Sequence, residues 1–239
     1  MTQDKDNPLS NQNLSTEELR SLLAYLPPHL HERTRALRSH RPDGSPTRHR
    51  PLNQSTSFER APIVYWTHHA QRTDENPALD VARTLSLALN RPLVVYHALS
   101  SDYQYASDRH HVFQLQSVLD LNQSYQQMGI RYVFHLQTRS DNSPALVRLL
   151  ERTNLLITDD FPGEPTDRWL RRLGLIPHLK ILAVDTACVV PMRLVGKPFD
   201  RAFAFRDATK KLYQERIDKA WPKIEAAAEY YAGSLPFTP

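Results

Sequence analysis

The sequence predicts an α/β protein built on a five-stranded parallel sheet with helices on both faces. Short apolar runs rich in β-branched and aromatic residues recur from residue 61 onward, and amphipathic segments separate them. Such runs are typical of strands buried on both faces, and their alternation with helices produces right-handed crossovers and a parallel sheet. The chain has 239 residues, enough to bury a sizeable core without disulfides. The predicted architecture is Rossmann-like.

Five apolar runs are expected to form the strands, in this order: Ile63–Trp66, Leu93–Leu99, Tyr132–Leu136, Leu155–Thr158 and Ile181–Val184. Three of the helices between them are expected to begin at a proline, which suits the first helical position because its missing N–H needs no partner there. These starts are Asn76-Pro77, Ser143-Pro144 and Glu164-Pro165.

A fourth helix is predicted over residues 108–128, and Gly129 is a natural residue to end it. Its expected apolar face consists of Val112, Leu115, Val118, Leu119 and Tyr125.

Residues 1–58 are polar and rich in proline, serine, arginine and histidine, so we expect a mostly disordered arm. A short amphipathic helix near residues 15–26 is the exception, because Ser15 and Glu18 have capping-box spacing. This helix needs a surface to dock on, either on the protein's own domain or on a partner. Its apolar face consists of Leu19, Leu22, Leu23 and Leu26.

The arm also carries a basic stretch, Arg33–Arg41, followed by Arg48 and Arg50. Two interpretations are open: contact with DNA through phosphate neutralisation, or a solvated tail.

The α/β domain is expected to span residues 59–205, followed by a C-terminal helix and linker over residues 206–239. The helix is predicted from Arg206 to Tyr231, with Ser234–Pro239 extended. Its candidate anchors are Leu212, Ile217, Trp221 and Ile224.

Composition limits the other possibilities. The only cysteine, Cys188, allows neither an intramolecular disulfide nor a cysteine-based zinc site, and a buried, inert thiol is expected there. No apolar run is long enough to cross a bilayer, and the polar start lacks a secretory signal, which favours a cytoplasmic protein without membrane contact. The formal net charge of +4 and pI near 9.2 fit DNA contact or an ordinary solvated surface equally well.

Ligands of open parallel sheets bind beyond the carboxyl ends of the strands. The polar and aromatic residues expected there form the candidate ligand-binding set: Trp66, His68, Arg72, Asp159 and Phe161.

No catalytic or metal-binding residue is predicted. The segment after the first strand, residues 67–76, contains no glycine, which disfavours a dinucleotide fingerprint or a phosphate-binding loop. A Gly-x-Ser-x-Gly nucleophile elbow is also absent from the sequence. His68 and His69 are adjacent on a strand end and point to opposite sides, so they are poorly placed to share an ion with Asp159 or Asp160.

Four segments, taken in order, resemble the photolyase and cryptochrome family, and class II photolyases most of all. The opening Val64–Leu79 resembles the family's first strand and loop, with Gln71, Arg72, Asn76, Ala78 and Leu79 matching. The others are Arg109–Phe113 with Leu119, Leu156–Pro162, and Val184–Pro191. The resemblance covers about residues 60–215.

The resemblance implies a domain, related to deoxyribodipyrimidine photolyase, that holds an antenna chromophore, a deazaflavin or a folate. In the family this domain passes excitation energy to FAD in a separate helical domain, which performs DNA repair on a flipped pyrimidine dimer. We therefore expect no FAD on this chain, no lyase activity from this chain alone, and a separate FAD-binding partner.

Two departures from the family pattern affect that expectation. The family's Ala-Arg-Thr-x-Arg appears here as Arg201-Ala-Phe-Ala-Phe-Arg206, and Glu75 replaces an aspartate. The alternative hypothesis is a sensor of a small ligand or nucleotide on the same scaffold, without photochemistry.

Overall fold

The computed structural model describes residues 18–37, 58, 60–103, 105–141, 143–176, 178–225 and 227–239. Predictions that fall on residues 1–17 and 38–57 lie outside the described residues. They include the capping box at Ser15 and the basic residues of the arm beyond Leu37.

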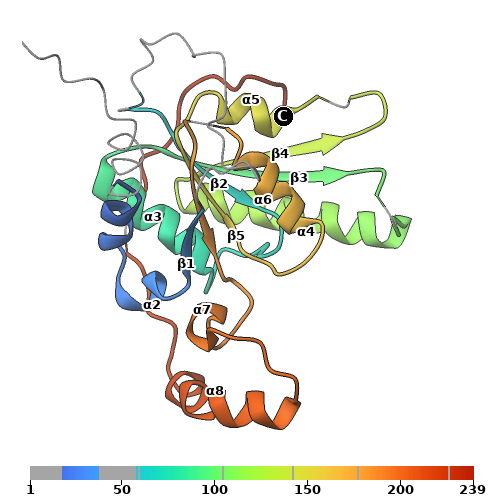
Figure 1. Ribbon diagram of the computed structural model, residues 1–239. Coiled ribbons are helices and arrows are strands. Elements are labelled where there is room, and N and C mark those ends of the chain that lie inside the picture. The colour runs from blue at the N-terminus through green and yellow to red at the C-terminus, as the bar shows by residue number, and fades with distance from the viewer. Residues whose placement is uncertain are drawn as a thin grey trace, which may run out of the picture.

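A six-stranded sheet in the order β1-β6-β5-β2-β3-β4 forms the centre of the molecule (Figure 1). The five predicted strands are confirmed, and all of them run parallel. Their bounds are β2 Ile63–Thr67, β3 Leu93–Ser100, β4 Arg131–Gln137, β5 Leu155–Asp159 and β6 Lys180–Val184.

The sixth strand, β1 (Thr34–Leu37), pairs antiparallel with β6 and corrects the predicted count of five. It lies inside the segment expected to be mostly disordered. Its sequence, Thr-Arg-Ala-Leu, has too few apolar residues to indicate a strand, and two arginines at this strand, Arg33 just before it and Arg35 within it, have partners far along the chain. Arg33 donates to the carbonyl oxygens of Cys188 and Val189, and Arg35 pairs with Asp160. These two arginines of the predicted basic arm are therefore engaged within the fold.

Helices cover both faces of the sheet. On one face α3 (Pro77–Leu89) and α4 (Asp108–Gln127) enclose a core together with α2 (Pro28–His31) and a helical segment at residues 18–24. On the other face α5 (Ala145–Leu150) and α6 (Thr166–Leu173) enclose a second core. The N-terminal helical segment docks on this protein's own domain through Leu19, Leu22 and Leu26.

One of the three predicted proline starts has a capping interaction, whereas Pro144 and Pro165 directly precede α5 and α6 and no side chain caps those two helices. Asn76 Oδ1 accepts the N–H groups of Ala78 and Leu79, and Pro77 occupies the first turn of α3. Gly129 follows the end of α4 with a φ of 66°, a conformation that favours glycine.

The expected apolar face of α4 is buried only in part. Val118 and Tyr125 are buried, whereas Val112 and Leu115 are exposed and Leu119 is 71% exposed. Length accounts for part of this exposure: the 20 residues of α4 extend about 30 Å, whereas the seven residues of β4 beneath it extend only about 23 Å. About one turn of α4 therefore exceeds the length of the strand.

The C-terminal helix is shorter than predicted. After α7 (Met192–Val195), α8 (Ala202–Ile217) ends well before Tyr231, and Pro222, which lacks an N–H, lies just beyond it. The chain then returns to the sheet, where Leu93 donates its N–H to Glu229 and Arg131 donates to the carbonyls of Tyr231 and Gly233. Its last residues lie beside α5 (Figure 1).

Among the described residues, no helix combines the length and the apolar character needed to cross a bilayer.

Candidate functional site

The order of the strands reverses at β2, which pairs with β3 on one side and with β5 on the other. In open α/β sheets a crevice beyond the carboxyl ends of the strands at such a reversal is the usual ligand site. Two segments meet there: the loop that follows β2, and the end of β5 at Asp159.

The centre of this crevice is filled by the protein's own carboxylate. Asp159 is fully buried, and its Oδ2 accepts the backbone N–H groups of His68, His69 and Ala70 at 3.0, 2.8 and 3.2 Å. The hydroxyl of Tyr65 donates to the other oxygen, Oδ1, at 3.2 Å. Burial and the nearby carboxylate raise the pKa of Tyr65 well above its ordinary value, so this hydroxyl stays a donor. The donors that could bind a foreign anion here are already used.

At the start of α3 the backbone N–H groups also have partners within the protein. Asn76 accepts the free N–H groups of the first turn, and its amide nitrogen donates to the carbonyls of Ala70 and Arg72. Arg72 itself donates to the carbonyls of Glu75 and Thr186, which ties this loop to the segment after β6. A nucleotide phosphate therefore finds no free backbone donor at this helix N-terminus.

A pocket of about 370 Å³ opens next to the crevice, on the face of the sheet that carries α5 and α6. This volume lies within the range of small-ligand sites. Strands β2, β3 and β4 supply its floor at their carboxyl ends. Its walls include Trp66, His68, Tyr96, His135, Trp169 and Arg172.

Aromatic rings form one wall. The ring centroids of Trp66 and Trp169 lie 5.6 Å apart, and that of His68 lies 4.7 Å from Trp66 and 5.8 Å from Trp169. Trp66 is buried, whereas Trp169 is 37% exposed and reaches solvent. The wall therefore offers flat π surfaces against which a conjugated ring can pack.

Two imidazole nitrogens in this pocket are buried without a hydrogen-bond partner among the described residues, Nε2 of His68 and Nε2 of His135. His135 is only 3% exposed. A buried polar atom left unpaired costs about 1–3 kcal/mol. Because both residues line one pocket, a ligand with a polar edge that reaches these nitrogens is the natural partner for them.

The charge state of His68 also suits such a ligand. Burial lowers the pKa of His68, and the Asp159 carboxylate opposes this effect only in part. The imidazole is therefore neutral near pH 7 and offers one donor and one acceptor nitrogen.

Arg172 supplies the cation of the pocket. Its side chain is exposed and has neither an ion pair nor a hydrogen bond with any described residue. The neighbouring Arg168 and Arg171 both pair with Glu164, so Arg172 is the arginine of α6 left available for an anionic group.

The structure brings two of the five predicted site residues into this pocket, Trp66 and His68. Asp159 lies beneath them as the anchor of the loop, Arg72 faces the segment after β6, and Phe161 stacks on His69 with ring centroids 4.1 Å apart. Ligand binding by these three stays a prediction. Within the described ranges, no cluster of three or more histidine, cysteine or carboxylate side chains is arranged to hold a metal ion.

Sequence reasoning missed four pocket residues: Tyr96, His135, Trp169 and Arg172. A signal existed for the first of them, because Trp66 and Tyr96 occupy the same register position on neighbouring parallel strands and face the same side. Trp169 and Arg172 gave no such signal, since only the packing of α6 against the sheet brings them to β2.

Comparison with known proteins adds the family. The profile described as DNA photolyase matches residues 63–224, more than half of the chain. A curated relative, the deoxyribodipyrimidine photo-lyase of Methanothermobacter thermautotrophicus, is 25% identical over 138 residues, which is 54% of this chain and 28% of that protein. The chain thus spans less than a third of the length of the curated relative it matches. These matches do not distinguish class II from other photolyases.

Solved structures with partial similarity include two universal stress proteins. The one from Archaeoglobus fulgidus aligns with a TM-score of 0.35 and 12% identity, covering 52% of this chain and 98% of that chain. The other, in complex with cAMP, aligns with a TM-score of 0.32 and 14% identity, covering 53% of this chain and 99% of that chain.

Proposed function

The chain belongs to the DNA photolyase family, and on that premise we propose that it is a light-harvesting domain that binds a flat antenna chromophore in the pocket beside Trp66. The observation that carries the proposal is the pair of buried, unpartnered Nε2 atoms of His68 and His135 within one aromatic-walled pocket. A conjugated ring with a polar edge satisfies both features at once.

The two chromophore classes that the family resemblance implies, deazaflavins and folates, fit this donor set. Both carry a fused heteroaromatic ring with hydrogen-bonding atoms along one edge. Trp66 and Trp169 supply apolar surface for the ring, and the two histidines supply imidazole nitrogens for the edge. Arg172 supplies positive charge for an acidic group such as a folate carboxylate. When bound, the chromophore absorbs light and passes the excitation on.

The proposal assigns the redox chemistry to another polypeptide. Because the match covers 28% of the curated relative, we do not transfer that protein's lyase activity to this chain. In our proposal a partner chain holds FAD and repairs the DNA lesion, while this chain contributes excitation energy. A cytoplasmic location, and DNA contact by the basic residues beyond Leu37, belong to the same proposal.

The alternative, a nucleotide sensor, is disfavoured by the crevice at β2. Asp159 already accepts the backbone N–H groups of His68 and His69, and Asn76 caps α3. A nucleotide in the usual position would have to displace the buried Asp159 carboxylate or the Asn76 cap.

The experiment is a spectroscopic titration of the purified chain with a deazaflavin and, separately, with a folate. We expect one of them to change its absorption in the near-ultraviolet or blue on binding and to quench tryptophan fluorescence from Trp66 and Trp169. Trp169→Ala should remove most of the binding, whereas Leu119→Ala, on α4 and outside the pocket, should leave it unchanged. Tight binding of a colourless nucleotide, with no response to either chromophore, would support the sensor instead.

A further inference from the structure

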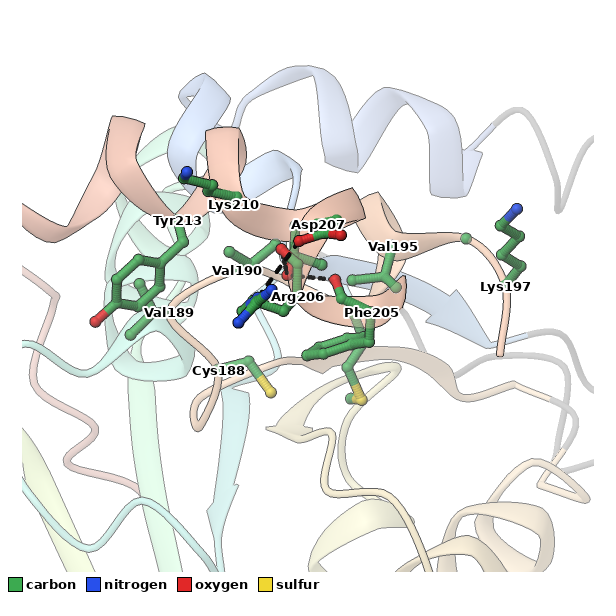
Figure 2. A pocket seen from close by; sticks show the side chains of 13 residues that line it. Cys188, Val189, Val190, Val195, Lys197, Phe205, Arg206, Asp207, Lys210 and Tyr213 are labelled. Carbon is green, nitrogen blue, oxygen red and sulfur yellow. Dashed lines mark hydrogen bonds and ion pairs between the residues drawn. The ribbon is translucent and has the colours of Figure 1, made fainter. Parts of the chain in front are cut away.

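A second and larger hollow lies away from the chromophore pocket. It measures about 1000 Å³ and is bounded by the segment after β6, by α7 and by α8 (Figure 2). Figure 1 shows α7 and α8 beyond one end of the sheet, so this groove does not share walls with the pocket at Trp66.

One wall of the groove is a stripe of α8. Phe205, Thr209 and Tyr213 line the groove. Together with Ile217, one turn beyond the lining, they recur every four residues and lie along one face of the helix. Only Thr209 is buried, while Tyr213 is 46% exposed and Phe205 and Ile217 are similarly exposed. Helices draw most of their stability from packing an apolar face, and this face has little to pack against in the described chain.

The facing wall is also apolar. Val189, Val190 and Val195 line it, and Val189 is exposed. Exposed apolar side chains on both sides of one groove are typical of a surface that a partner covers.

Positive charge surrounds these walls. The charged residues of the lining are Lys197, Arg206 and Lys210 against a single carboxylate, Asp207. Arg206 pairs with Asp207, whereas no ion pair joins Lys197 or Lys210 to any residue that the structure describes. An occupant with negative charge beside an apolar stripe therefore complements the groove.

We propose that this groove is an interaction surface that binds an acidic amphipathic helix of a partner protein. The stripe favours a polypeptide over a small molecule: from Phe205 to Ile217 it extends about 18 Å along the helix axis, one turn beyond Tyr213, the last residue of α8 that lines the groove. A helix with apolar residues at positions i, i+3, i+4 and i+7 covers such a stripe throughout its length. The proposal is independent of whether a chromophore binds at Trp66.

The test uses two fluorescein-labelled helical peptides, each about 18 residues long, and the full chain. Both carry the same leucine stripe, but one has glutamate and the other lysine on the flanking positions. By fluorescence anisotropy we expect the glutamate peptide to bind and the lysine peptide to bind at least about tenfold more weakly. Added salt should reduce the difference.

Variants of the lining residues test whether the peptide binds in the groove. Reversing the charge of both lysines, K197E with K210E, should weaken the binding of the glutamate peptide and strengthen the binding of the lysine peptide. Unfolding of the variant cannot produce this exchange of affinities. Tyr213→Glu and Val189→Asp, one on each wall, should each abolish binding. The matched control is Leu115→Glu, which changes a similarly exposed apolar residue on α4 and should have no effect.

Several results would overturn the proposal. Equal affinity for the two peptides would show that charge does not select the occupant. Retained binding in both Tyr213→Glu and Val189→Asp would place the site elsewhere. A dimer in sedimentation that Tyr213→Glu dissociates would assign the groove to a second copy, and displacement of the peptide by an equal concentration of dodecanoate would assign it to a small amphiphile.

Discussion

The backbone N–H of His69 donates to the buried carboxylate of Asp159 at 2.8 Å, across 90 positions of the sequence. Because the N–H groups of His68 and Ala70 join the same oxygen, a single side chain of β5 shapes the loop after β2. That loop carries His68 into the aromatic wall of the pocket. The Asp159 carboxylate thus acts as an internal anion that fixes the loop forming part of the candidate ligand site.

Removing this anion should destabilise the domain. Asp159→Ala leaves three backbone N–H groups and the Tyr65 hydroxyl without their acceptor, and we expect a loss of roughly 3 kcal/mol in the free energy of unfolding. Urea denaturation measures it. The control is Asp160→Ala, which breaks only the partly exposed pair with Arg35 and should cost about 1 kcal/mol or less. Equal losses in the two variants would contradict the role of Asp159.

The unpaired histidines should matter for binding and not for folding. His135→Leu removes a buried nitrogen that has no partner among the described residues, so the free energy of unfolding should stay the same or rise. Affinity for the chromophore should fall by about tenfold, the equivalent of one lost hydrogen bond. Isothermal titration calorimetry and thermal melts give the two quantities separately. Unchanged affinity would exclude His135 from the polar edge of the site.

Acid should destabilise the domain through His97. Burial lowers the pKa of this imidazole from 6.5 to about 4, so the unfolded chain binds more protons than the folded one between these values. The contribution of neutral His97 to the free energy of unfolding is therefore complete above about pH 6.5 and is lost as the pH falls toward 4.

The variant His97→Asn tests this dependence. It keeps a polar group near the Tyr132 hydroxyl, which lies 2.7 Å from His97 Nδ1, but it cannot titrate. Unfolding free energies measured from pH 7 to pH 4 should fall less steeply in the variant than in the natural chain. The remaining slope comes from His29 and His68, whose pKa values burial also lowers. Identical slopes would show that His97 is not neutral in the folded state.

The return of the chain after α8 should contribute to stability through Trp221. Its Nε1–H donates to Asp80 at 2.8 Å, and its ring lies under the Arg33 guanidinium at 5.3 Å. Trp221→Phe keeps an aromatic ring but leaves the buried Asp80 carboxylate without this donor, and the expected cost is about 1–2 kcal/mol. Burial already raises the pKa of Asp80, and losing the donor should raise it further, which NMR titration can follow. Trp169→Phe, at a partly exposed position, is the matched control and should cost less.

Local signals in the sequence determined the strands and the starts of the helices. The runs at Ile63–Trp66 and Leu93–Leu99 are apolar enough to require burial on both faces, and Asn76-Pro77 caps its helix with its own side chain. These interactions span only a few residues, so composition and spacing reveal them. The family resemblance rested on the same local segments, and the profile match confirms it.

Tertiary structure alone decided the sixth strand and the composition of the site. Thr34–Leu37 becomes a strand because β6 offers its edge, and Trp169 reaches Trp66 because α6 packs into the same core cluster as Trp66. Likewise, Asp159 proved to be a structural anion because the loop after β2 closes over it. The physical reason is common to all three: their partners lie some 90 or more residues away, and no periodicity in a sequence records which distant groups will meet.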